Sequence, residues 1–203
     1  NAGSSNSSAS RNSFFGHKAG DANSTGEENS FFGSSAGNSN TIGSNNSYFG
    51  HLAGADVTAG TSNTLIGHNT GSATTIGDNN TFVGKGAGTT NTTGSNNTLI
   101  GYNAEVASPN LAFATAIGSG AVVDQSGRVV IGRPSDSVFI PGTFSFGEMH
   151  GTGGSDLCYS QGNAIALSPC SSSRRYKHEF ADYKGGLSYV NRLRPVTFRW
   201  NNT

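Results

Sequence analysis

The sequence predicts an all-β protein built as a parallel β-solenoid, and three observations carry this prediction. A 17-residue segment recurs without insertion along the first half of the chain. Glycine returns at fixed places in every copy, and every copy carries two adjacent apolar residues just before a glycine. Together these features indicate short strands joined by glycine turns, with each coil stacked on the coil before it.

The repeat begins at residue 12, where NSFFGHKAGDANSTGEE is followed by NSFFGSSAGNSNTIGSN, NSYFGHLAGADVTAGTS, NTLIGHNTGSATTIGDN and NTFVGKGAGTTNTTGSN. A coil of this length is too short for two helices and suits two short strands with two glycine turns. Stacked strands lie ~4.8 Å apart, so eight coils predict roughly 35–40 Å of axial length. The glycines that count the coils are Gly16, Gly33, Gly50, Gly67, Gly84, Gly101, Gly118 and Gly132.

The adjacent apolar residues predict an apolar stripe on the outside of the solenoid. Neighbouring side chains of a strand point to opposite faces, so one member of each pair fills the coil and the other leaves it. The sequence does not say which member points inward. A stripe of this length needs a partner, and the simplest one is a cyclic homotrimer of this chain. The pairs are Phe14–Phe15, Phe31–Phe32, Tyr48–Phe49, Leu65–Ile66, Phe82–Val83 and Leu99–Ile100.

Polar columns of the repeat offer candidate binding sites, each with a structural alternative. Asparagine recurs at every coil from Asn12 to Asn97, and we expect an internal hydrogen-bonded ladder there rather than a sugar site. His17, His51 and His68 share a turn position with Ser34, Lys85 and Tyr102, which favours a solvated column over a metal site. We therefore expect no metal, no cofactor and no catalysis within the repeats.

A threonine row also has two interpretations. Thr64, Thr81 and Thr98 follow one another as on a flat ice-binding face, but serines replace threonine at Ser13, Ser30 and Ser47. Ice binding is therefore not expected.

Composition and charge exclude several classes of partner. The chain of 203 residues is 33% hydrophobic and 12% charged with zero net charge. Residues 1–150 hold five basic and nine acidic side chains, and residues 151–203 hold seven basic and three acidic ones. The short basic part mixes both signs and lacks spaced aromatic residues, so nucleic-acid binding is not expected. No apolar run approaches the ~18 residues of a membrane span.

The two cysteines predict a disulfide-closed hairpin. Cys158 and Cys170 flank YSQGNAIALSP, in which Gly162–Asn163 predicts a turn. Two cysteines alone do not build a tetrahedral zinc site, and His150 and His178 lack the usual ligand spacing. A disulfide implies an oxidising compartment.

Residues 114–132, ATAIGSGAVVDQSGRVVIG, resemble the head repeat of trimeric autotransporter adhesins. The 17-residue step shortens to a 14-residue step between Gly118 and Gly132, which is the commoner length in such heads. The resemblance extends over about 120 residues and implies a left-handed parallel β-roll trimer. Beyond it, SDSVFIPGTFSFG predicts a neck with a turn at Pro141–Gly142.

The stretch SSRRYKHEF, with GLSYVNRLRPVTFRW after it, resembles the start of the intramolecular chaperone domain of phage tailspikes, endosialidases and long tail fibres. In that family a self-cleaving serine peptidase follows a trimeric fibre. The resemblance assigns Ser172 as nucleophile, Lys177 as its base and Ser171–Ser172 as the scissile bond. It also implies a short helical segment, and the second block is matched by Leu193, Arg194, Pro195, Val196, Phe198 and Trp200.

The chemistry of a serine–lysine pair supports this assignment, whereas two departures from the family's pattern weaken it. A lysine activates serine only when it is neutral, which nearby Arg174 and Arg175 would favour. His178 is an alternative base. Ser173 stands where many relatives have Asp, and the 203 residues do not include the longer helical part that the resemblance implies. We therefore expect no cleavage in this chain, while self-cleavage in a longer parent stays an alternative.

The predicted organisation is a lead-in (1–11), a β-roll head (12–133), a neck (134–150), a cysteine-bounded hairpin (151–170) and the start of a chaperone domain (171–203). The predicted function is attachment by a trimeric fibre or adhesin on a virion or bacterial surface, outside the cell. The receptor is unknown, with a glycan as one candidate. The alternatives are an autoproteolytic fibre-assembly protein and a purely structural extracellular filament subunit.

Overall fold

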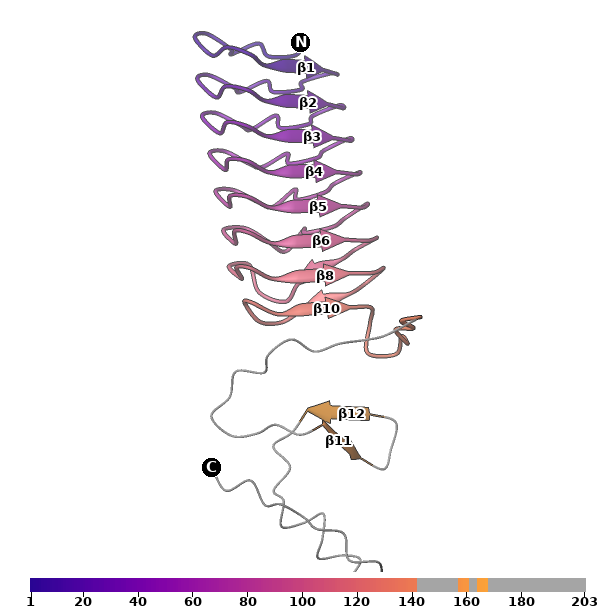
Figure 1. The fold of residues 1–203 in the computed structure, drawn as a ribbon. Helices are drawn as coiled ribbons and strands as arrows, with labels where there is room; N and C mark the ends of the chain where they lie inside the picture. Colours follow the sequence, from indigo (N-terminus) through magenta and orange to yellow (C-terminus); the bar gives the residue numbers. More distant parts are fainter. Residues whose placement is uncertain (142–156, 161–163, 168–203) are drawn as a thin grey trace, which may run out of the picture. The chain divides into compact units, whose positions relative to one another are not determined.

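The computed structural model describes residues 1–141, 157–160 and 164–167, and these residues form strands and turns but no helix. The chain divides into two units, Asn1–Phe139 and Ile140–Thr203. Figure 1 shows the first unit as a stack of coils that carry one strand each on the same side. The all-β solenoid predicted from the repeat is therefore confirmed.

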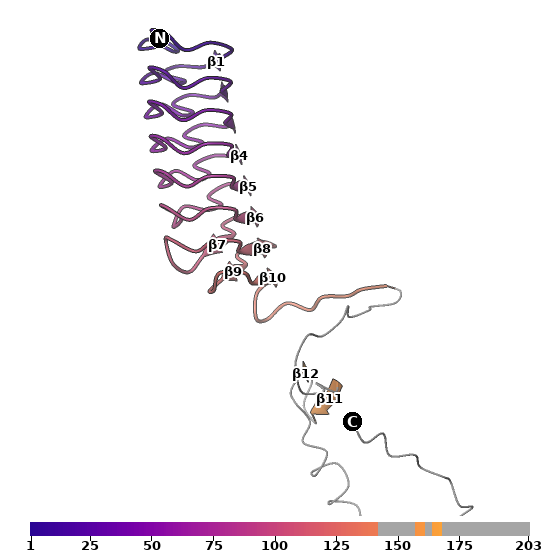
Figure 2. The ribbon, with the colours of Figure 1, turned by 60° about the vertical axis from the view of Figure 1, so that its left-hand side comes forward.

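Eight strands of the solenoid form one parallel sheet, in the order β1-β2-β3-β4-β5-β6-β8-β10 (Figures 1 and 2). Each strand holds three residues: β1 Ser13–Phe15, β2 Ser30–Phe32, β3 Ser47–Phe49, β4 Thr64–Ile66, β5 Thr81–Val83, β6 Thr98–Ile100, β8 Thr115–Ile117 and β10 Val129–Ile131. Phe14 pairs with Phe31, and Phe31 with Tyr48, so the register follows the repeat of the sequence. The last step is shorter than the others, because Thr115 pairs with Val129.

Glycine follows each strand of this sheet, and after β1 to β6 there is no room for a side chain. Gly33 follows β2 with a φ of 146°, a conformation that other residues rarely adopt. A Cβ atom at this position would lie 2.3 Å from the carbonyl oxygen of Gly50 in the next coil. The glycine column therefore allows successive backbones to approach closely at this corner.

The first member of each apolar pair fills the coil. Phe31, Tyr48 and Leu65 are fully buried, and alanines such as Ala36 and Ala53 form part of the same core. Space around these rings is tight, since a Cβ on Gly37 would lie 2.5 Å from the Phe31 ring. A large side chain on the strand thus packs among small residues of the turns, which keeps the coil thin.

The prediction of two strands per coil is wrong for the regular coils, which have one. On the far side of the first coil, the backbone N–H groups of Ser24 and Thr25 both donate to Thr41 O, at 2.9 and 3.2 Å. A carbonyl shared in this way interrupts the alternating pattern of a strand ladder. Only the last coils add a second small sheet, in which β7 (Glu105–Val106) pairs in parallel with β9 (Val122–Val123).

In the second unit, β11 (Leu157–Ser160) pairs with β12 (Ala164–Leu167) in an antiparallel hairpin. This agrees with the hairpin predicted around Gly162–Asn163. The register places Cys158 opposite Ala166 rather than opposite Cys170. Cys170 lies outside the described residues, so the predicted disulfide stays a prediction.

Candidate functional site

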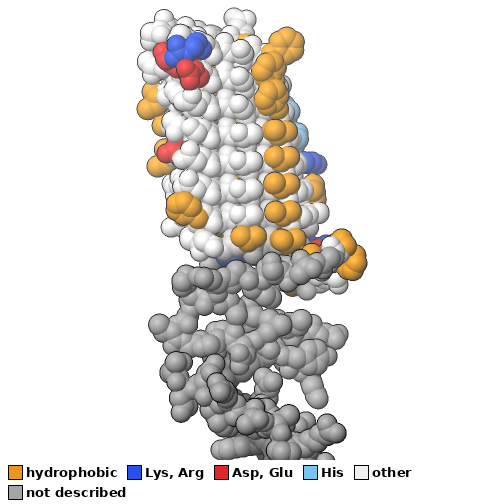
Figure 3. All heavy atoms as spheres, viewed as in Figure 1, with side chains coloured by type: hydrophobic (Ala, Val, Ile, Leu, Met, Phe, Trp, Pro, Cys, Tyr) orange, Lys and Arg blue, Asp and Glu red, His pale blue; other side chains and the backbone are white. Residues whose placement is uncertain are grey.

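The second member of each apolar pair forms a continuous column on the outside of the solenoid, which we call the apolar column. Its large side chains expose between 37% of Phe32 and 74% of Phe15, while Val83 is half-buried. Figure 3 shows it as a row of hydrophobic side chains along the stack. The column consists of Phe15, Phe32, Phe49, Ile66, Val83, Ile100, Ile117 and Ile131.

One aromatic pair of the apolar column is stacked as closely as the rings of the inner core. The ring centroids of Phe32 and Phe49 lie 4.9 Å apart with 3° between the ring planes, which matches the spacing of stacked strands. A column of hydroxyl groups, including Ser47 and Thr64, runs beside it at the first position of each strand. The outer face of the sheet therefore offers one apolar and one hydroxyl group per coil from β1 to β8.

The Asn12–Asn97 column forms the internal ladder that the sequence predicts. The backbone N–H of Asn29 donates to Asn12 Oδ1 at 2.9 Å, and Asn46 repeats this contact with Asn29 at 3.0 Å. Each side-chain amide also donates to the carbonyl 14 residues further along the chain, as Asn29 does to Gly43 O at 2.8 Å. Asn29 and Asn46 are fully buried, so they do not offer their amides to a sugar.

A second asparagine column lies in the core and was not predicted. The Nδ2 atom of Asn40 donates to Asn23 Oδ1 at 2.8 Å, and Asn23 donates in turn to Asn6 Oδ1 at 3.0 Å. The Asn23 amide also donates to Gly26 O at 2.9 Å, the carbonyl that Asn12 contacts at 2.7 Å. Two asparagine side chains thus converge on one turn carbonyl. Non-asparagine residues interrupt this column, which hides it in the sequence.

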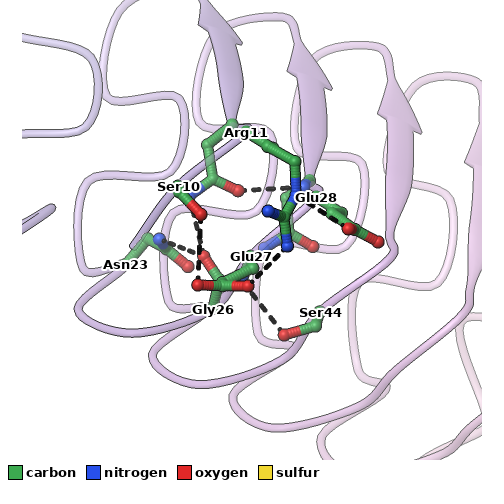
Figure 4. Close-up of polar contacts among 9 residues, drawn as sticks. Ser10, Arg11, Asn23, Gly26, Glu27, Glu28 and Ser44 are labelled. Carbon is green, nitrogen blue, oxygen red and sulfur yellow. Dashed lines mark hydrogen bonds and ion pairs between the residues drawn. The ribbon is translucent and has the colours of Figure 1, made fainter. Parts of the chain in front are cut away.

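A charged cluster joins the first two coils (Figure 4). Arg11 contacts Glu27 and Glu28 of the next coil, at 2.8 Å each. Ser10 Oγ donates to Glu27 Oε1 at 3.1 Å, and the backbone N–H of Glu27 donates to Ser44 Oγ at 3.0 Å. Arg11 therefore balances one of the two carboxylate charges. Because these groups are about half exposed, the ion pairs add little stability.

The turn column after the glycines is solvent-exposed, as predicted, and it contains a stacked histidine pair. The rings of His51 and His68 lie 5.2 Å apart with 26° between their planes, and both are exposed. Within residues 1–141, no group of three or more histidine, cysteine or acidic side chains is arranged to hold a metal ion.

The hydroxyl of Tyr48 is a buried polar group without a hydrogen-bond partner. Its column neighbours are Phe31, whose ring centroid lies 4.6 Å away, and Leu65. The Asn63 amide donates instead to Gly77 O at 2.8 Å. Burial raises the pKa of the Tyr48 phenol well above its usual value, and the Asn63 side chain only partly offsets this. This hydroxyl belongs to the core and has no role at the surface.

The residues assigned to self-cleavage, Ser171, Ser172 and Lys177, lie outside the described residues. That assignment therefore stays a prediction. In the described part of the chain, no helix has the length and apolarity needed to cross a bilayer. Comparison of the chain with protein-family models, curated proteins and solved structures finds no match.

Proposed function

We propose that this chain forms the rigid stem or head of a homotrimeric extracellular fibre that attaches to a host surface. The observation that carries the proposal is the apolar column, which presents one large side chain per coil along the entire solenoid. With about 200 Å² for a large apolar side chain, the exposed fractions correspond to roughly 650 Å² per chain. This approaches the ~800 Å² that each partner buries in a standard interface.

The partner that fits this column best is another copy of the chain. An apolar column with a coil-to-coil repeat of ~4.8 Å is matched by a surface with the same repeat, and a second solenoid in register supplies it. The column is a single side chain wide, so three copies can close around one axis. The resemblance of residues 114–132 to trimeric adhesin heads supports three copies.

The oligomeric state tests the assembly part of this proposal. Sedimentation equilibrium of the full chain should give three times the mass of one chain, which is 20.7 kDa. The double variant Phe32→Ser/Phe49→Ser should sediment as a smaller species while keeping its β-type circular dichroism. A wild-type chain that stays monomeric at micromolar concentration would contradict the proposal.

Attachment is tested separately on the assembled protein. The fluorescently labelled trimer should bind a subset of bacterial cells or arrayed glycans in a saturable manner. The dissociated double variant, with fewer binding sites per particle, should bind more weakly. A trimer that binds none of these targets would favour the purely structural filament subunit over an adhesin.

A further inference from the structure

Next to the apolar column runs a second column of exposed side chains, which we call the rim column. Each of its members stands two residues after a member of the apolar column. The residue between them is a glycine, so no side chain separates the two columns. Any partner that covers Phe49 or Ile66 must therefore pass close to His51 and His68. The rim column consists of His17, Ser34, His51, His68, Lys85, Tyr102, Ser119 and Arg133, of which only Ser34 is half-buried. Figure 3 shows its histidines beside the hydrophobic row.

His51 and His68 are the paired members of this column. Their rings are stacked at 5.2 Å, whereas His17 is followed along the column by Ser34. Lys85 comes next after His68, so the lower half of the column already carries a positive charge. No described carboxylate lies within salt-bridge distance of either ring, since the described ion pairs join Arg11, Arg128 and Arg133 to acids.

The residues that flank this pair in the turn and on the neighbouring strand positions are uncharged. Leu52 and Asn69 follow the two histidines in the turn, and the backbone N–H of Asn69 donates to His51 O at 2.9 Å. Across the apolar column lie the hydroxyls of Ser47 and Thr64. A proton taken up by this pair is therefore opposed by Lys85, and no described acid lies within salt-bridge distance to balance it.

We propose that the His51–His68 pair forms the rim of the self-association surface, and that protonation of the pair opposes assembly. This inference rests on the proposed function, because it needs a second copy of the chain against the apolar column. In the assembly, neutral imidazoles lie near the Ser and Thr hydroxyls of the adjacent copy and can exchange hydrogen bonds with them.

The sign of the pH effect follows from linkage. Histidine is the side chain that changes charge between pH 8 and 5. Two imidazolium ions in adjacent coils repel each other, and this repulsion is weakest when water surrounds them. Assembly removes part of that water, so protons bind preferentially to the dissociated chain. Lowering the pH therefore shifts the equilibrium toward dissociation.

The test measures the dissociation constant of the full chain by sedimentation at pH 7.5 and pH 5.5. The wild type should lose at least tenfold in affinity at the lower pH. The variant His51→Ser/His68→Ser should change less than threefold, and serine suits the position because Ser34 and Ser119 occupy it naturally. His17→Ser, which removes an unpaired histidine of the same column, should retain the wild-type response.

A permanent charge gives an independent check. His51→Arg/His68→Arg should already assemble at least tenfold more weakly at pH 7.5 and should then respond little to acid. A wild type that assembles equally at both pH values, or an equal acid response in the double serine variant, would overturn this inference while leaving the trimer intact. A chain that is monomeric at both pH values would instead refute the proposed function.

Discussion

Asn40 and Val57 occupy the same place in successive coils, and Val57 leaves the buried Oδ1 atom of Asn40 without a hydrogen-bond donor. In the coil before, Asn40 itself donates to Asn23 Oδ1 at 2.8 Å. Valine cannot repeat that contact. The carbonyl of Gly60 likewise accepts from Asn46 at 2.8 Å but lacks the second amide that Gly43 receives from Asn40 at 3.0 Å.

Val57→Asn should therefore be tolerated in spite of placing an amide in the core. The new side chain can donate to Asn40 Oδ1 and to Gly60 O, which offsets the ~1.5–3 kcal/mol of lost apolar burial. We expect the free energy of unfolding to change by less than about 1 kcal/mol. The measurement is urea unfolding followed by circular dichroism.

Val106→Asn is the matched control. Val106 is also a buried valine, 1% exposed, but it belongs to β7 and to no asparagine column. An asparagine there should destabilise the fold by about 3 kcal/mol, because nothing compensates for its desolvation. Equal losses in the two variants would show that the asparagine columns do not act as ladders.

Gly33→Ala should disrupt the close approach between coils. The added Cβ would meet the Gly50 carbonyl oxygen at 2.3 Å, and the φ of 146° disfavours any side chain. We expect a loss of about 3 kcal/mol or more in the free energy of unfolding, from strain together with the backbone clash.

Gly127→Ala separates these two causes. Gly127 also has a positive φ, of 72°, but a Cβ there would meet no atom within 4 Å. Its substitution should cost only about 1–2 kcal/mol. If both alanine variants lose the same stability in thermal unfolding, the contact between coils is not what requires glycine at position 33.

The sequence predicted those features of the fold that recur without interruption. The repeat period, the Asn12–Asn97 ladder and the division of each apolar pair between core and surface all follow from unbroken columns. The second asparagine column was missed because Val57 and Thr74 interrupt it. Which member of a pair points inward depends on how the turns on either side orient the strand. Both members are apolar in every coil, so the sequence pattern is the same whichever of them points inward.

A further feature escaped prediction because asparagine or glycine marks it in only half of the coils. The residue two positions before a sheet strand adopts a left-handed conformation, with φ of 59° at Arg11 and Glu28 and 55° at Phe113. Asparagine or glycine fits such a position, as at Asn45, Asn79, Asn96 and Gly127, whereas the arginine, glutamate, serine and phenylalanine of the other coils do not. Tertiary contacts between coils impose this turn irrespective of the side chain.

Tyr48→Phe should stabilise the protein. The variant removes a buried hydroxyl that has no hydrogen-bond partner and keeps the ring stacked on Phe31. Relief of the unsatisfied group should raise the free energy of unfolding by about 1 kcal/mol. Tyr102→Phe, at a side chain that is 54% exposed, should have no measurable effect. A loss of stability in Tyr48→Phe would reveal a hydrogen bond at this hydroxyl.

The same tyrosine should make the fold sensitive to alkali. Burial raises the pKa of the Tyr48 phenol in the folded chain, whereas the unfolded chain ionises near pH 10. The contribution of the neutral phenol to the free energy of unfolding is thus fully present below pH 10 and is lost as the pH rises above 10. Wild type should lose about 1.4 kcal/mol per pH unit more than Tyr48→Phe above pH 10. Parallel stability curves for the two proteins would contradict the burial of a neutral phenol.

Phe31 and Phe32 are neighbours on β2 with opposite predicted roles, which makes them the sharpest test of the two faces. Both stack in a regular aromatic column, with centroid distances of 4.6 Å for Phe31–Tyr48 and 4.9 Å for Phe32–Phe49. They differ in burial, which is complete for Phe31, whereas Phe32 is 37% exposed.

Phe31→Ser should cost about 3–5 kcal/mol in the free energy of unfolding, because it leaves a cavity inside the coil. Phe32→Ser should change the unfolding of the dissociated chain by about 1 kcal/mol or less, while raising the dissociation constant of the assembly at least tenfold. Sedimentation and urea unfolding of both variants measure the two quantities side by side. Equal unfolding losses would show that the outer ring belongs to the core, and an unchanged dissociation constant for Phe32→Ser would show that the apolar column is not where the chains meet.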